Sequence, residues 1–311
     1  MAYTTGETAN YRTMLAVVRD FLTSDASLVA AGQAWAQIGG QTGSIGVNDF
    51  VSLQGPGLAG DDQILLSLQT FTNVPSAQYC IGISGHTAYA PSVPRPDPPG
   101  LNSPWVYMPL IDSAIRYWLV ANGRRFILVT KSNSRYDVMY GGLVMPDHLP
   151  SDWPYPVLAA ASSSVLQAGS SDLLSHSNFW RSLRGGYLFT PEQLWRPLEN
   201  LQTTGGNPNN GSEFAPDSGR LMAADWKTNI GPSEFARTLD NQPWIRRGRL
   251  AQFGNDDISA RNFLGHFDGV YFTPAIGAVV ESEIEIGTDR YLVVPNVYRS
   301  TVGQMAAIHL E

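Results

Sequence analysis

Apolar and polar positions alternate in short runs along most of this chain, a pattern that predicts β-strands. The clearest case is the segment 117–156, where apolar runs at 118–121 and 126–130 flank Asn122-Gly123. Asn-Gly is the dipeptide that best tolerates the positive φ angles of a type I′ hairpin turn. A third run at 136–145 then predicts a strand that returns across the sheet. We therefore expect a continuous β-meander.

The same strand pattern recurs on both sides of this meander. Before it, runs bounded by turns lie at 50–53, 63–71 and 78–84, and after it at 267–272, 282–286, 291–294 and 305–310. The runs at 282–286 and 291–294 predict a hairpin about Gly287-Thr288-Asp289, and the last run predicts a closing strand. Prolines at 91–100 cannot donate to a sheet ladder, so this stretch predicts an extended connector.

Only the N-terminal segment shows a helical period. Apolar side chains recur every three or four residues between Tyr11 and Leu22, Asn10 can cap this helix, and Asp25 can cap a short second one over 26–35. The fold class predicted is therefore mainly β, with antiparallel sheets in a sandwich-like arrangement and an N-terminal α-helical segment, α+β overall. This helical segment is expected to pack on a sheet.

The pattern divides the chain into three parts. Residues 1–160 carry the helix and the β-meander, and 263–311 carry C-terminal strands that complete the β core. Between them, 161–262 mixes Ala/Ser-rich and Gly/Asn-rich stretches with large aromatic residues. This loop-rich middle part predicts an inserted subdomain, or loops that become ordered on assembly.

Composition narrows the classes of partner. Charged residues make up 15% of the chain, against about 25% in ordinary soluble domains. Lysine occurs only at Lys131 and Lys227, and the other basic residues are arginine. Arginine is favoured at protein interfaces, and the base composition of the genome could produce the same bias. A net charge of −7 disfavours nucleic acid as a partner. Without a signal peptide or a long apolar window, we expect a soluble protein made in the cytoplasm.

Templates for catalysis and metal binding fail. The chain has no P-loop and no nucleophile elbow, its histidines stand apart from one another, and the adjacent carboxylates Asp61-Asp62 and Asp256-Asp257 lie in turn sequences. Glu281, Glu283 and Glu285 alternate along a strand, which predicts a solvent face or a guard against strand pairing. The single cysteine, Cys80, predicts a small buried hydrophobe. We expect no enzyme, no metal and no cofactor.

The meander ends in an aromatic loop stiffened by proline. Trp153 and Tyr155, with the nearby Trp105 and Tyr107, could stack on sugar rings, as in carbohydrate-binding modules. Aromatic residues flanked by proline also serve as anchors that fill a pocket of a neighbouring subunit. We favour the interface over the sugar.

Four sequence segments together resemble a family of tailed-bacteriophage virion structural proteins, components of the neck or tail of long-tailed particles. The likeness extends over 1–60, 105–160 and 265–311, and it leaves the middle third uncovered. The segments are Leu-Val-Ala-Ala-Gly-Gln-Ala-Trp at 28–35, Tyr-Trp-x-x-Ala-Asn-Gly-Arg-Arg-Phe-x-x-Val at 117–129, Trp-Pro-Tyr-Pro at 153–156 and Tyr-Leu-Val-Val-Pro-Asn-Val-Tyr-Arg at 291–299.

The resemblance implies a non-enzymatic virion component, assembled in the host bacterial cytoplasm from copies of itself and other neck or tail proteins. A closed ring needs a heterologous interface, in which one face of a subunit meets a different face of the next. The candidate contact residues are Arg124, Arg125, Trp153, Tyr155, Tyr298 and Arg299. An alternative interpretation is that Arg124-Arg125 forms only the exposed edge of a hairpin.

Two other functions stay open. The chain could be a baseplate or fibre protein that contacts host-surface glycans through Trp153. It could also be a tail-associated hydrolase, for which Asp268 is a candidate acid.

Overall fold

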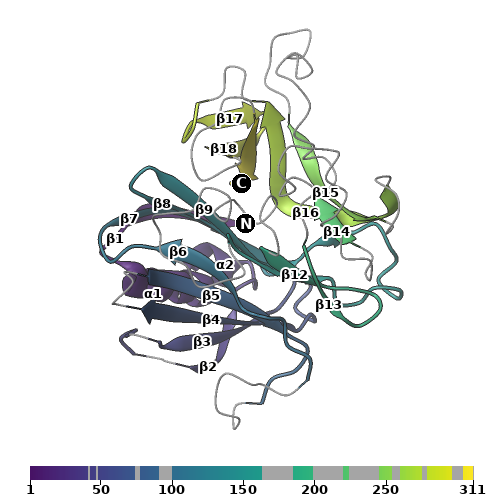
Figure 1. Cartoon of the computed structure of the whole chain (residues 1–311), viewed down its shortest axis with the longest axis horizontal. Helices are drawn as coiled ribbons and strands as arrows, with labels where there is room; N and C mark the ends of the chain where they lie inside the picture. The colour runs from purple at the N-terminus through teal and green to yellow at the C-terminus, as the bar shows by residue number, and fades with distance from the viewer. Residues whose placement is uncertain are drawn as a thin grey trace, which may run out of the picture.

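The computed structural model folds the chain mainly into antiparallel β-sheet with one helical segment near the N-terminus, which confirms the predicted fold class (Figure 1). Three sheets stack as layers, and we name them the helix-side sheet, the central sheet and the C-terminal sheet. The structure describes residues 1–40, 43–46, 48–73, 78–90, 100–162, 185–198, 220–223, 245–253, 260–274, 279–295 and 304–310.

The central sheet contains the predicted meander. Its strand order is β1-β7-β8-β9-β11-β12-β13, and every neighbouring pair is antiparallel. The strands are β1 (Ala2–Thr8), β7 (Ile115–Ala121), β8 (Arg125–Ser132), β9 (Arg135–Leu143), β11 (Val157–Ala160), β12 (Gly186–Phe189) and β13 (Trp195–Pro197).

Both faces of the central sheet are covered, and this explains its long apolar runs. Leu119 and Leu128 belong to the apolar cluster shared with the helix, whereas Val120 and Ile127 belong to the cluster shared with the C-terminal sheet. All of β9 is buried. Strands buried on both faces have near-continuous apolar sequences instead of strict alternation.

The helix-side layer consists of two helices and a meander of five strands in the order β2-β3-β4-β5-β6. Asn10 Oδ1 accepts hydrogen bonds from the backbone N–H groups of Arg12 and Thr13, both at 3.1 Å, and so caps the first helix as predicted. The elements are α1 (Tyr11–Ser24), α2 (Ala26–Ala30), β2 (Ala36–Gly40), β3 (Phe50–Gly55), β4 (Ile64–Asn73), β5 (Gln78–His86) and β6 (Val106–Leu110).

The second helix is shorter than predicted. It begins at the Asp25 cap but ends at Ala30, and Gly32 then takes a positive φ of 66°. The chain turns there because Trp35, only 2% exposed, inserts its ring into the core and donates from Nε1 to the Asn122 carbonyl at 2.9 Å. A longer helix would carry Trp35 away from this site.

The C-terminal sheet has the order β14-β15-β16-β19-β18-β17, and the short β10 also pairs with β16. The predicted C-terminal hairpin and closing strand are both present, and β19 lies between β16 and β18. The strands are β10 (Met145–Pro146), β14 (Arg220–Ala223), β15 (Arg246–Phe253), β16 (Ala260–Pro274), β17 (Glu283–Ile286), β18 (Asp289–Pro295) and β19 (Gln304–His309).

The hairpin at Asn122-Gly123 forms, but not with the predicted type I′ turn. Neither residue has a positive φ; instead Asn122 Oδ1 accepts from the backbone N–H groups of Arg124 and Arg125. Gly123 is needed for another reason. Its carbonyl accepts from Gly57 N at 2.8 Å, and a Cβ on Gly123 would lie 1.9 Å from the Gly57 oxygen. The turn therefore docks on the β3–β4 loop.

Several strands were not predicted, chiefly β1, β2 and β6. The described strands of the middle part join the sheets on either side of it, β12 and β13 extending the central sheet and β14 and β15 the C-terminal sheet. The proline-rich connector at 91–100 lies, apart from Gly100, outside the described residues.

Candidate functional site

Trp153 lies inside the subunit and not at an exposed loop tip. Its side chain is 1% exposed and belongs to the apolar cluster between the central and C-terminal sheets. The indole Nε1 donates to the Phe189 carbonyl at 2.8 Å, and the ring meets His148 edge to face at 6.1 Å. This corrects the expectation that Trp153 contacts a neighbouring subunit or a glycan, because a ring so enclosed reaches neither.

Tyr155 fastens the loop after β10 to the helix-side sheet. Its hydroxyl donates to the His86 carbonyl at 2.8 Å and accepts from Leu65 N at 3.0 Å. Burial raises the pKa of Tyr155 to about 12, so the phenol stays protonated at neutral pH. The proline-flanked aromatic pair thus anchors layers of its own chain.

Arg125 is also buried, with 0% exposure, which corrects both predictions for it: a subunit contact and an exposed hairpin edge. Its Nε lies 3.6 Å from Asp268 Oδ2 on β16, so the guanidinium pairs the central sheet with the C-terminal sheet. Nη2 donates to Met1 Sδ at 3.2 Å, whereas Nε and Nη1 have no hydrogen-bond partner among the described residues. Asp268, the acid considered for hydrolysis, is engaged in this pair.

Arg124 is half-buried beside the β3–β4 loop. Burial and the neighbouring Asp61 raise the pKa of Asp62, and the charge of Arg124 opposes that rise. Asp62 N donates to the Pro56 carbonyl at 3.2 Å, so this carboxylate pair does lie in a turn. The other two candidate contacts, Tyr298 and Arg299, lie outside the described residues.

Among the described residues, the largest group of interacting charges surrounds Glu281, which the sequence placed on a solvent face. Glu281 precedes β17, has a positive φ of 69° and directs its carboxylate at the central sheet. It accepts from Lys131 Nζ at 2.5 Å, from Arg116 Nη1 at 2.9 Å and from the Tyr136 hydroxyl. The signal in the sequence was Lys131, one of only two lysines in an arginine-rich chain.

The electrostatics of the cluster favour the ordinary charge states of Glu281, Lys131 and Tyr136. Burial opposes ionisation of Glu281, but hydrogen bonds from Lys131 and Tyr136 outweigh it and lower the pKa of the carboxyl. The hydrogen bond between Lys131 and Glu281 raises the pKa of Lys131. Burial is the larger cause, and the hydrogen bond to Glu281 the next, of the raised pKa of Tyr136. A general acid or base works best with a pKa near neutrality, so the cluster suits a structural tie better than proton transfer.

A second polar group in the helix-side sheet has the residue types of a hydrolase triad. Ser67 Oγ lies 2.8 Å from His86 Nε2, and His86 Nδ1 lies 3.0 Å from Asn102 Oδ1. Ser67 is 3% and His86 1% exposed, and Ser67 Oγ also bonds Ser52 Oγ at 2.8 Å. Because β4 is paired on both sides, the Ser67 N–H belongs to a ladder and is not available as an oxyanion donor. The group is therefore a buried hydrogen-bond chain.

Trp105 and Tyr107, named for sugar stacking, lie with Phe71 on the outer face of the helix-side sheet. The Phe71 ring meets those of Trp105 and Tyr107 edge to face at 5.4 and 5.1 Å. They surround Gly82, where an added Cβ would lie 2.6 Å from the Phe71 ring. Trp153 and Tyr155 are not part of this cluster, so the four aromatic residues do not form one surface.

The described residues hold no group of three or more His, Cys, Asp or Glu side chains that could bind a metal ion. Within the same residues, no helix has both the length and the apolar character required to cross a membrane. Cys80 is buried, as predicted. No family model and no curated protein matches the chain.

Proposed function

We propose that this chain is a non-enzymatic structural component of a bacteriophage virion, built into the neck (collar) or tail as a symmetric ring of copies. The resemblance of its sequence segments to virion proteins motivates the proposal. One structural observation supports it: the charged side chains that meet between the central sheet and the C-terminal sheet, in the part of the chain described, are engaged with one another. Glu281 and Arg125 each join two sheets through such contacts. Side chains committed in this way suit a protein that acts through a fixed shape.

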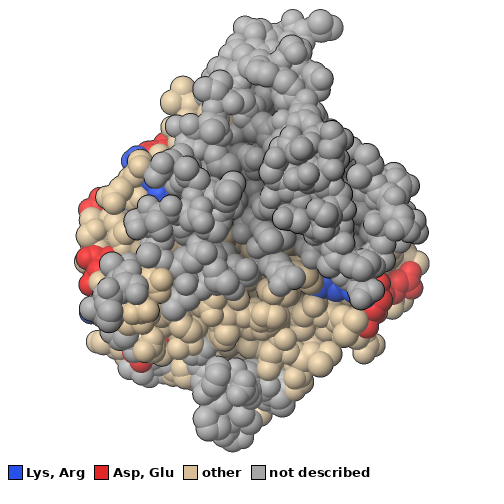
Figure 2. Space-filling model, viewed as in Figure 1, with Lys and Arg blue, Asp and Glu red and all other residues tan. Residues whose placement is uncertain are grey.

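The surface is consistent with such a role. Figure 2 shows that the described part of this face is mainly uncharged, with Lys, Arg, Asp and Glu gathered toward its margins. Interface cores between proteins are depleted of charged residues, and 15% charged residues is a low content for a whole chain. A ring would bury part of this surface between subunits.

The test is the composition of the particle. We expect peptides of this chain in mass spectra of gradient-purified virions, and rings in electron micrographs of the purified protein. An abundant host cytoplasmic protein serves as the control for carry-over. A chain absent from virions, and monomeric by light scattering at high concentration, would refute the proposal.

A second candidate function, contact with host-surface glycans, is favoured by the cluster of Phe71, Trp105 and Tyr107. Its rings are partly exposed on the outer face of a sheet, a composition that suits sugar stacking. Trp105→Ala is the informative variant, since Trp153→Ala would remove a buried core side chain. Saturable binding to host lipopolysaccharide that survives in Trp105→Ala would exclude this cluster as the glycan site.

A further inference from the structure

The outer edge of β1 is a backbone surface to which no other strand of the described residues pairs. β1 ends the central sheet and pairs with β7 alone. Asn122 N donates to Arg125 O at 3.0 Å, which makes Asn122 and Arg125 a hydrogen-bonded pair. Hydrogen-bonded and non-bonded pairs alternate along an antiparallel ladder. The backbone groups of the even-numbered residues of β7 therefore bond β8, and those of the odd-numbered residues point toward β1. Thr5 Oγ1 donating to Tyr117 O at 2.8 Å agrees with that assignment.

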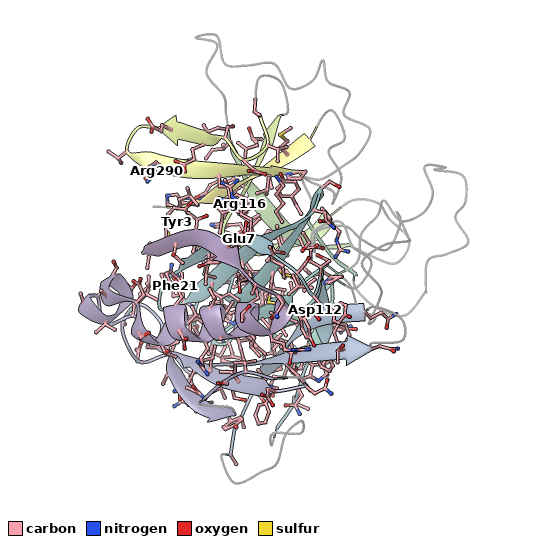
Figure 3. The ribbon with its side chains drawn as sticks, turned by 90° about the vertical axis from the view of Figure 1, so that its left-hand side faces the viewer. Tyr3, Glu7, Phe21, Asp112, Arg116 and Arg290 are labelled. Atoms are coloured by element: carbon pink, nitrogen blue, oxygen red, sulfur yellow. The ribbon has the colours of Figure 1, made fainter. Side chains whose placement is uncertain are left out.

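The even-numbered residues of β1 are therefore bonded to β7, because Gly6 stands opposite Tyr117 in the register. Tyr3, Thr5 and Glu7 direct their N–H and C=O groups away from the sheet. The side chains of Thr5 and Glu7 are exposed. Figure 3 views this side of the molecule, with Tyr3 and Glu7 on β1 beside Arg116 and below Arg290.

Four other sheet edges in the described part of the chain carry devices that discourage pairing, and a fifth, β14, is only 4 residues long. β6 contains Pro109 and β13 contains Pro197, which cannot donate to a ladder. β17 exposes Glu283 and Glu285, and β2 has a bulge followed by Gly40 with a φ of 93°. β1 has an unbroken register without proline or bulge. Natural proteins usually blunt free edges, so an edge that is regular along its whole length and carries a single charge, Glu7, is the candidate site for strand addition.

We propose that β1 pairs antiparallel with β1 of a second copy of this chain, about a two-fold axis through Thr5. Thr5 then opposes the partner's Thr5, and Tyr3 opposes the partner's Glu7. Each residue of such a pair can exchange both backbone hydrogen bonds, because all three point outward. The two central sheets become one continuous sheet.

The side chains suit this register better than an axis through Glu7 or Tyr3, and they make a second copy a fitting occupant. An axis through Glu7 would place two carboxylates opposite each other, which is destabilising. An axis through Tyr3 would leave Glu7 with no residue of the partner's β1 opposite it. The axis through Thr5 pairs threonine with threonine and sets Glu7 against a phenol that can donate to it. The strand is thus complementary to itself.

This inference goes beyond the proposed function, since it needs only a second copy and no particle. A two-fold contact is isologous, whereas neighbours in a cyclic ring meet through heterologous contacts. Failure of the pairing would leave the virion proposal standing, and absence from virions would leave the pairing standing.

Cysteine cross-linking tests the register. Paired Cα atoms about 5.5 Å apart fall within disulfide reach, and the native Cys80 is buried. We expect Thr5→Cys to form a covalent dimer on mild oxidation. Glu7→Cys alone should not, since its counterpart would be about 13 Å along the strand. A mixture of Tyr3→Cys and Glu7→Cys should cross-link again. Equal cross-linking of Thr5→Cys and Glu7→Cys would indicate random collision and overturn the proposal.

Sedimentation of two further variants tests the pairing without a covalent bond. Thr5→Pro removes the N–H that faces the partner, whereas Thr5→Val keeps it, and both lose the bond to Tyr117. We expect the dimer Kd of Thr5→Pro to exceed that of Thr5→Val at least about tenfold. Equal Kd values or a monomeric wild-type protein would overturn the proposal. Binding of a different protein to β1 of the wild-type chain, but not to the Thr5→Pro variant, would also overturn the proposal.

Discussion

The two faces of the central sheet are attached to their neighbouring layers in different ways. Both carry large apolar clusters. On the helix side, the polar contacts between layers join neutral side chains, as in Thr8 with Thr13, or end on backbone groups. Examples of the second kind are Tyr155 donating to His86 O and Arg135 Nη2 donating to Pro109 O. On the C-terminal side, charged groups meet charged groups, around Glu281 and in the pair of Arg125 with Asp268. The C-terminal layer is therefore the one that acid should loosen.

Removal of a buried tryptophan should lower the stability of the protein the most, and by a similar amount on each face of the central sheet. Trp35 contacts the helix-side cluster and Trp153 the C-terminal cluster, and each donates to a backbone carbonyl. Trp35→Ala and Trp153→Ala should each lower the free energy of unfolding by about 3–5 kcal/mol. Urea titration measures this, with the exposed Leu58→Ala as a control expected to change it by less than about 0.5 kcal/mol. A loss under about 1 kcal/mol at either site would contradict the assigned packing.

Breaking the Arg125–Asp268 pair should rank second. Asp268→Asn leaves a buried guanidinium without its counter-charge and should cost about 2–3 kcal/mol, below the full value because the Asp268 side chain is 19% exposed. The double variant Arg125→Met/Asp268→Leu should recover most of that loss, since it removes both charges. If the double variant is the less stable, the pair contributes more than its desolvation cost.

Glu281→Gln should cost about 1–2 kcal/mol, because it removes charge-assisted hydrogen bonds at a site that is partly open to water. The folded-state pKa of Glu281 lies below its usual value of 4.5. Its stabilisation is therefore present above that value and is lost as the pH falls through the folded pKa. We expect the wild-type melting temperature to fall more steeply than that of Glu281→Gln below about pH 4.5. Parallel curves would mean that Glu281 does not titrate with folding.

Tyr155→Phe should have the smallest effect, about 1 kcal/mol, through two lost hydrogen bonds to backbone groups. The loss should be the same at pH 5 and pH 8, in contrast to Glu281→Gln in acid. Because the folded-state pKa of Tyr155 is raised to about 12, its stabilisation is lost as the pH rises from 10 through 12. Alkaline unfolding followed by circular dichroism should be shallower in the variant. A loss of stability at pH 8 that depends on the salt concentration would contradict the proposed difference between the two faces of the central sheet.

Local features of the fold could be predicted because they depend on residues near one another in the chain. The helix α1 follows from its apolar period and the Asn10 cap, and β7 to β9 follow from their runs and from the Asn122-Gly123 hairpin. β1 was missed because most of its side chains are polar. Its pairing with β7 spans more than a hundred residues, and no local pattern announces it.

The candidate contacts failed at Trp153 and Arg125 for a related reason. Aromatic and arginine side chains suit both interfaces and interiors, so residue type alone cannot choose between them. The partners that decide the matter, Phe189 and Asp268, come from strands far along the chain. Glu281 was placed on a solvent face because its period matches that of Glu283 and Glu285. The turn before β17 breaks that period and points its carboxylate inward.

What the amino-acid sequence determined by itself is the fold class, the capped helix and most of the strands, since short-range periodicity and turn chemistry specify these. The tertiary structure alone decided which polar and aromatic groups are enclosed, which sheets they join and which strand edge stays open. A side chain is buried or paired only when segments far apart in the chain come into contact. The free energy of such a contact therefore depends on the tertiary structure and cannot be predicted from the local sequence. The open edge of β1 is such a property.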